Sequence, residues 1–261
     1  MITITEVLGK AAQGRTEPFI CRGDDGQLYY VKGRNAGFIS LCCEWVAGSL
    51  ARHIAARVSG FALPEFTIAE VPQALVTQSD RDDIRHLGAG PVFASLKVDR
   101  AREITWEDAR KLTPNVMAGV LFIDHWLQND DRTLSDLGGN PNLLITHESE
   151  IRNGETSGNM VPYLWVIDFN LAFDPLFTRS FFLDNHVFAG LLKAWPPGFQ
   201  EAVMQSLPAV LETVPRLFRE LPDEWLYQDG DDSLPVHLSQ NDVLEMLQLP
   251  LQEPEAFWKL P

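Results

Sequence analysis

The stretch NDDR at Asn129–Arg132, followed by NPNLLI at Asn140–Ile145 and WVIDF at Trp165–Phe169, decides the fold. An aspartate-bearing loop, a short apolar strand opened by Asn142 and a second apolar strand ended by Asp168 follow one another. An antiparallel hairpin of the two strands would bring Asn142 and Asp168 together, because one precedes a strand and the other follows its partner. Hard oxygen ligands converging from neighbouring segments suit Mg²⁺ and a nucleotide phosphate.

The same residues also have a purely structural explanation. Asp and Asn beside apolar strands commonly cap turns through hydrogen bonds to their own backbone. The stretch alone therefore does not decide between a turn and a metal site. A second set of residues, far upstream, adds weight to the metal site.

The composition is that of a globular protein. Of 261 residues, 45% are hydrophobic and 22% are charged, enough for one domain or two packed lobes with a substantial core. The net charge of −15 argues against a broad nucleic-acid surface, since no basic stripe offsets it. A few Lys, Arg and metal ions that converge locally can still bind ATP in an acidic protein.

Cysteine usage and hydropathy predict a cytoplasmic protein with no membrane partner. Cys21, Cys42 and Cys43 provide no disulfide framework and no CxxC motif. The sequence shows no secretory leader and no apolar run that approaches membrane-spanning length.

The first residues predict strands. β-branched and aromatic residues favour strands within 1–32, with a turn at Gly23–Gly26. Gly14, Arg15 and Thr16 form a small polar turn whose backbone amides can cover a phosphate. An ordinary hairpin tip is the simpler explanation of a single glycine.

Lys32 ends the strand LYYVK, and apolar spacing predicts a helix over Phe38–Val58 that carries Glu44. A carboxylate flanked by small residues on a largely apolar helix requires a partner, because burying it unpaired is costly. Lys32 is the candidate, although a lysine at a strand end is usually a solvated edge charge. Kinases hold the α- and β-phosphates with such a strand lysine and helix glutamate.

The remaining pattern divides the chain near Val98, into 1–97 and 98–261. Residues 66–71 and 91–96 are predicted strands, and the polar residues 76–90 between them are a predicted surface loop.

Thr105 with Asp108 resembles a capping box. Thr113 with Pro114 opens a helix to Leu127 that is apolar nearly all round and should be buried. His125 on this helix is interpreted as a core or edge histidine. Residues 146–160 are predicted to be a mobile excursion, and the chain is predicted to be helical from about Pro196 onward.

Taken in order, these residues resemble the HipA-like kinase family, in particular its compact branch related to the C-terminal portion of HipA toxins. More distantly, the chain is similar to phosphatidylinositol kinases and protein kinases. The residues that carry the likeness are GRT at Gly14–Thr16, YYVK ending at Lys32, the helix with Glu44, FIDHW at Phe122–Trp126, NDDR with Asp131, NPNLL with Asn142, and VIDF with Asp168.

The resemblance implies an α+β, protein-kinase-like fold of two lobes. A β-rich N-lobe over 1–97 would cover the nucleotide with Gly14, Arg15, Thr16, Lys32 and Glu44. A mostly helical C-lobe over 98–261 would carry the catalytic residues: Asp131 orienting or deprotonating the acceptor hydroxyl, Arg132 supporting the loop, and Asn142 with Asp168 holding Mg²⁺.

The implied activity is ATP- and Mg²⁺-dependent phosphotransfer to an unknown protein substrate, of the Ser/Thr kinase type, with autophosphorylation included. A pseudokinase that binds a partner, and transfer of AMP, are the alternatives. The sequence departs from the kinase pattern in two places. Asn170 stands where many protein kinases have Gly, and the spacing from Asp131 to Asn142 is long, which leaves Asn140 and Asp130 as competing residues.

Overall fold

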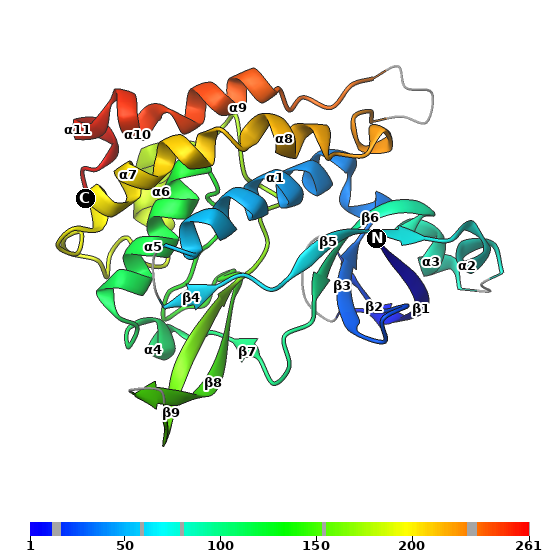
Figure 1. Cartoon of the computed structure of the whole chain (residues 1–261), viewed down its shortest axis with the longest axis horizontal. Coiled ribbons are helices and arrows are strands. Elements are labelled where there is room, and N and C mark those ends of the chain that lie inside the picture. The colour runs from blue at the N-terminus through cyan, green and yellow to red at the C-terminus, as the bar shows by residue number, and fades with distance from the viewer. Residues whose placement is uncertain (12–16, 58–59, 79–80, 153–154, 229–233, 261) are drawn as a thin grey trace. The chain divides into compact units, whose positions relative to one another are not determined.

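The computed structural model describes residues 1–11, 17–57, 60–78, 81–152, 155–228 and 234–260 (Figure 1). The chain forms two compact units. The first consists of Met1–Val46, Pro64–Val98 and Pro215–Ser239, and the second of Ala47–Leu63, Asp99–Val214 and Gln240–Pro261. The expected α+β class is confirmed, with a strand-rich N-terminal part and a largely helical C-terminal part.

The first unit is built on a closed five-stranded barrel in the order β1-β2-β3-β6-β5. Neighbouring strands are antiparallel except for β1 and β5, which are parallel. Its strands are β1 (Ile2–Lys10), β2 (Phe19–Gly23), β3 (Leu28–Lys32), β5 (Phe66–Val71) and β6 (Gly90–Leu96). Its helical elements are η1 (Arg34–Ala36), the first part of α1 (Phe38–Ala55), α2 (Gln73–Thr77), α3 (Asp82–Leu87), α8 (Val214–Arg219) and η2 (Asp223–Trp225).

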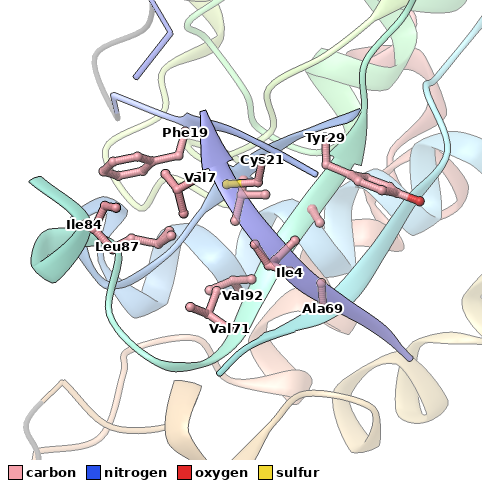
Figure 2. Close-up of a cluster of buried hydrophobic side chains, with 12 residues drawn as sticks. Ile4, Val7, Phe19, Cys21, Tyr29, Ala69, Val71, Ile84, Leu87 and Val92 are labelled. Carbon is pink, nitrogen blue, oxygen red and sulfur yellow. The ribbon is translucent and has the colours of Figure 1, made fainter. Parts of the chain in front are cut away.

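Buried apolar side chains fill the barrel, as Figure 2 shows for Ile4, Phe19, Cys21 and their neighbours. Ile84 and Leu87 join them from α3, with 4% and 0% of their surfaces exposed. The prediction of a surface loop over residues 76–90 is therefore wrong. Two apolar residues among charged ones are enough to pack a short helix against the barrel, and the polar composition of the stretch conceals them.

The three cysteines are free, buried thiols. Burial raises the pKa of the Cys21 thiol to about 12, and that of Cys42 likewise to about 12. Thiolate, the reactive form, is therefore negligible at neutral pH.

The end of strand β3 lies directly against the end of α3. A Cβ atom on Gly33 would come within 2.2 Å of the Leu87 carbonyl oxygen, so a side chain there would push the two segments apart. This close approach fixes the backbone next to Lys32. Residues 215–239 join the same unit through Trp225, whose Nε1 donates to the Pro91 carbonyl at 3.0 Å.

The second unit combines helices with a four-stranded sheet in the order β4-β9-β8-β7. Its strands are β4 (Phe61–Ala62), β7 (Arg102–Glu103), β8 (Leu143–Arg152) and β9 (Glu155–Val166). Its helices are the last part of α1, α4 (Trp106–Ala109), α5 (Pro114–Trp126), α6 (Arg179–Asn185), α7 (Phe199–Leu211), α9 (Gln240–Leu247), α10 (Leu249–Gln252) and α11 (Pro254–Phe257).

Helix α5 begins as its sequence predicts and is the core of this unit. The Thr113 hydroxyl accepts from the Val116 amide, and Pro114 occupies the first turn. The predicted capping box of Thr105 and Asp108 also forms, at the start of α4. Every residue of α5 from Val116 to Trp126 is buried, as expected for a helix that is apolar all round. No helix in the described part of the chain is long and apolar enough to cross a membrane.

Strands β8 and β9 form one long hairpin, which projects from the sheet in Figure 1. Thr146 pairs with Tyr163 and His147 with Pro162, and the pairing continues outward from there. The expectation that residues 146–160 are an excursion between two short strands is therefore wrong for the described residues, which extend the two strands themselves. Backbone hydrogen bonds make this ladder, so the polar composition of the stretch gave no sign of it.

Candidate active site

Lys32 and Glu44 form the expected ion pair within the first unit. The Lys32 ammonium lies 2.5 Å from Glu44 Oε1, and 8% and 2% of the two residues are exposed. Strand β3 presents the lysine and helix α1 presents the glutamate. The alternative of a solvated edge lysine is excluded, because a buried ammonium and carboxylate fix each other's position.

Replacing Glu44 by Gln is expected to lower the free energy of unfolding by roughly 1–3 kcal/mol, the range for losing a buried hydrogen bond to a charged group. The buried Lys32 ammonium would then face a neutral amide. Urea unfolding measures the loss. Glu107→Gln is the matched control, because the exposed pair of Glu107 with Lys111 contributes little to stability. Equal stability of the two variants would contradict the role given to Glu44.

The Gly turn expected to cover the nucleotide lies outside the residues that the structure describes. Gly14, Arg15 and Thr16 belong to residues 12–16, which are not among the described residues. Their expected contact with phosphate remains a prediction.

The base of the β8–β9 hairpin brings Asn142 and Asp168 together, as the two apolar strands predicted. Leu143 pairs with Val166, and the Ile167 amide donates to the Asn142 carbonyl at 3.1 Å. Asn142 and Asp168 both have left-handed backbones, with φ of 45° and 64°. Such conformations cost energy in residues other than glycine and persist only where the surroundings hold them, often at functional sites.

Asp131 lies against this base from the preceding loop. Its Oδ2 accepts from Asn140 Nδ2 at 2.7 Å and from Asn142 Nδ2 at 3.1 Å. Asn140 and Asn142 therefore share one carboxylate oxygen, although the sequence set them in competition. Because Asn142 gives its amide nitrogen to Asp131, its amide oxygen is the atom that a cation would bind.

The extra residues between Asp131 and Asn142 form a closed side loop. Thr133 and Asn140 exchange hydrogen bonds, from the Thr133 amide to the Asn140 carbonyl at 2.9 Å and from the Asn140 amide to the Thr133 hydroxyl at 3.2 Å. Residues 134–139 therefore form a side loop whose two flanking residues, Thr133 and Asn140, are held together. The long spacing in the sequence does not separate the two side chains in space.

Asp130, the alternative to Asp131, lies in a different electrostatic environment. Partial burial raises the pKa of its carboxyl group, and the nearby carboxylates of Asp174 and Asp131 raise it further. Asp131 is the one of the two whose carboxylate accepts hydrogen bonds from the amides of Asn140 and Asn142.

Arg132 is completely buried and joins its own loop to the base of the β8–β9 hairpin. Its Nε donates to Asp124 Oδ2 at 2.6 Å and its Nη2 to Asp124 Oδ1 at 3.2 Å. Its Nη1 donates to the carbonyls of Asn142 at 2.5 Å and Ile167 at 3.0 Å. Arg132 therefore ties the Asp131 loop to Asp124 and to the base of the hairpin, and its expected role in supporting this loop remains a prediction.

Asp124 and His186 complete this network, and both are buried. His186 Nε2 lies 2.9 Å from Asp124 Oδ2, and Asn129 Nδ2 donates to Asp124 Oδ1 at 2.9 Å. Burial by itself would raise the pKa of Asp124, but the charge of Arg132 and the bond from His186 hold it below its ordinary value. Asp124 is therefore ionised.

His186 is neutral and its tautomer follows from its contacts. Burial lowers its pKa, although Asp124 acts in the opposite direction. Its Nδ1 accepts from the Phe188 amide at 3.2 Å, so the proton is on Nε2 and points at Asp124.

His125, which follows Asp124 in the sequence, packs among aromatic rings instead. It stacks on Phe257, with ring centroids 4.2 Å apart, and burial lowers its pKa to about 3.

Neither Asp124 nor His186 was predicted to belong to the site, although Asp124 lies within FIDHW. A signal existed for Asp124, because an acid on a helix that is apolar all round requires a partner and Arg132 follows eight residues later. No local signal existed for His186, which is 62 residues from Asp124 in the sequence.

The donor set at the hairpin base fits Mg²⁺. Asn142 and Asp168 supply hard oxygen atoms, and Mg²⁺ commonly binds through one or two carboxylates together with substrate phosphates and water. The described residues contain no group of three or more His, Cys, Asp or Glu that would hold a metal ion without such help.

The chain was compared with curated proteins, with solved structures and with models of protein families. The comparison with curated proteins gives no match. Among solved structures, the chain is similar to the Rio2 kinase of Chaetomium thermophilum in an ADP/Mg²⁺-phosphoaspartate complex, with 11% identity, a TM-score of 0.35, and coverage of 95% of this chain and 67% of that one. The family model of HipA-like kinases matches residues 4–261. Since that match spans almost the whole chain, the protein belongs to the HipA-like kinase family.

Proposed function

We propose that the protein is an ATP- and Mg²⁺-dependent phosphotransferase that acts on a hydroxyl group of a protein, in the manner of a Ser/Thr kinase, with itself as one acceptor. The observation that carries the proposal is the base of the β8–β9 hairpin. There Asp131 contacts Asn142, and Asp168 follows the strand paired with β8, within a chain of the HipA-like kinase family.

The nucleotide is assigned to the residues of the first unit. The buried pair of Lys32 and Glu44 presents one fixed ammonium group, which suits the α- and β-phosphates. The turn Gly14–Thr16 would cover the phosphates. In this proposal, the lobe expected over residues 1–97 covers the nucleotide, and the lobe expected over residues 98–261 carries out the transfer.

Asp131 has the acid–base role. Its carboxylate would accept a hydrogen bond from the acceptor hydroxyl and align the oxygen with the γ-phosphate. It would take the hydroxyl proton as the new bond from oxygen to the γ-phosphorus forms and the bond from that phosphorus to the bridging oxygen breaks, which releases ADP. The amides of Asn140 and Asn142 hold the same carboxylate in place. Asn142 and Asp168 are the residues that would hold Mg²⁺, and the chemistry it supplies when bound is neutralisation of the phosphate charge.

Two labelled nucleotides test the proposal. The purified protein is incubated with Mg²⁺ and ATP labelled at the γ-phosphorus, or at the α-phosphorus, both alone and with a library of Ser- and Thr-containing peptides. Transfer of the γ label only, dependent on Mg²⁺, is the expected result. Transfer of the α label would show AMP transfer instead, and transfer of neither label would indicate a pseudokinase that works by binding a partner.

A further inference from the structure

We infer that His186 and Asp124 are positioning residues that, through Arg132, fix the hairpin base on which the proposed metal ligands stand. The inference rests on the proposed function. His186 lies outside the residues that carry the family resemblance, and Asp124 lies within FIDHW but has no role assigned there. Neither is exposed enough to touch a substrate, with 5% and 0% of their surfaces accessible.

The first step is the contact of Arg132 with the hairpin. A single nitrogen, Nη1, donates to the Asn142 carbonyl and to the Ile167 carbonyl. Asn142 is one proposed ligand, and Ile167 immediately precedes the other, Asp168. Because both ligand residues have left-handed backbones, they need an external restraint, and Arg132 bonds to the backbone of both strands at that place.

The second step is the orientation of Arg132 itself. A guanidinium is a planar fork, and Asp124 receives two of its donors, so the side chain cannot rotate without breaking both bonds. Its planar group also lies over the Phe169 ring, 5.5 Å from the ring centroid. The direction of Nη1 therefore depends on where the Asp124 carboxylate is held.

The third step is the hold on Asp124. Two neutral donors, Asn129 Nδ2 and His186 Nε2, bond to its two oxygens and fix the carboxylate plane. The proton arrangement of His186 is fixed in turn, since the Phe188 amide occupies Nδ1. His186 is thus needed as a neutral donor at one nitrogen and an acceptor at the other.

His186 also closes a loop in the chain. It directly follows α6, and Val187 donates its amide to the Arg132 carbonyl at 3.1 Å, while Thr133 forms a β-bridge with His186. The segment between Ile167 and His186 therefore contacts the Asp124–Arg132 pair at both of its ends, through the Ile167 carbonyl and the His186 ring. Displacement of His186 releases both the carboxylate that orients Arg132 and the far end of this segment.

The test compares His186→Leu with His186→Gln and His186→Asn. The longer Gln amide reaches the place of Nε2 and restores the donor to Asp124, whereas the shorter Asn does not. His125→Leu is the matched control, because His125 is also buried and neutral and adjoins Asp124 in sequence but belongs to the aromatic core. Thermal melting of each variant shows that it is folded.

The first measurement uses the protein without nucleotide or metal. Hydrogen exchange of the Ile167 amide, which bonds to the Asn142 carbonyl, reports how firmly the hairpin base is held. His186→Leu and His186→Asn are expected to speed this exchange about tenfold or more, the factor for losing one hydrogen bond to a charged group. His186→Gln and His125→Leu should stay close to the wild type.

The second measurement is the kinetics of transfer. In His186→Leu, kcat should fall and the Mg²⁺ concentration for half-maximal rate should rise, each about tenfold, while KM for ATP at saturating Mg²⁺ stays unchanged. The Gln variant should recover both quantities. A folded His186→Leu that exchanges and turns over like His125→Leu would overturn the inference, as would an Asn variant superior to the Gln variant. If the wild type transfers no phosphate, the proposed function fails, and the exchange measurement still decides the role of His186.

Discussion

Replacement of Asp131 by Asn should lower the rate of phosphate transfer about 10²–10⁴-fold, the usual contribution of a positioned general base. The amide has no negative charge to attract the acceptor proton. It still offers one oxygen to Asn140 or Asn142, so the loop should keep its shape. The loss should therefore appear in kcat, with nucleotide affinity and thermal stability close to those of the wild type.

Initial rates of γ-phosphate transfer measure this change, with Asp136→Asn as the matched control. Asp136 is an exposed aspartate in the same loop and bonds to neither asparagine amide. Asp130→Asn is the second comparison, because Asp130 adjoins Asp131 in the sequence. Activity of Asp131→Asn within a few fold of the wild type, or a larger loss in Asp130→Asn, would show that Asp131 is not the base.

Replacement of Arg132 by Met is expected to lower the free energy of unfolding by about 3–5 kcal/mol, the cost of removing one partner from a buried ion pair. Asp124 would keep its bonds from His186 and Asn129 but lose the positive charge of Arg132, with no surface exposed to water. The carbonyls of Asn142 and Ile167 would lose a shared donor as well. No other single substitution proposed for this protein should cost as much stability.

The pH dependence of this loss follows from the pKa of Asp124. In the wild type that pKa is depressed, so the ionised carboxylate contributes stability above the ordinary Asp pKa of about 3.9. That contribution is lost as pH falls through the lower folded pKa. Without Arg132, burial dominates and the pKa should rise, so protonation relieves the buried charge at acidic pH. The difference in free energy of unfolding between variant and wild type should be largest at neutral pH and should decrease as pH falls.

Urea unfolding over a pH series measures both effects. Arg110→Met is the control for the loss of an exposed arginine and should leave stability unchanged. The double variant with Asp124→Leu should recover part of the loss, because no buried charge remains. A loss below about 1 kcal/mol in Arg132→Met, or one that does not vary with pH, would contradict the buried pair as described.

The sequence predicts those parts of the site whose signals are local. Glu44 is an acid on an apolar helix with a strand lysine shortly before it, and burial requires the two to meet. Asn142 and Asp168 flank two apolar strands, and antiparallel pairing alone brings them together. In both cases one element and its neighbour determine the contact.

The parts that the sequence did not predict depend on distant contacts or on the backbone. Leu87 joins the barrel core because α3 packs against Gly33, far away in the sequence. The outer part of the β8–β9 hairpin is held by backbone hydrogen bonds, to which side-chain composition is a poor guide. His186 reaches Asp124 only after the chain has passed through β8, β9 and α6.

The most direct test of the central claim, that the hairpin base holds the metal of a nucleotide, is a calorimetric titration with ATP, with and without Mg²⁺, of the wild type and Asp168→Asn. The wild type should bind ATP more tightly when Mg²⁺ is present. Asp168→Asn should lose that gain while its affinity without Mg²⁺ stays the same, and Asp184→Asn, an exposed control, should resemble the wild type. An equal gain from Mg²⁺ in the wild type and in Asp168→Asn would contradict the claim.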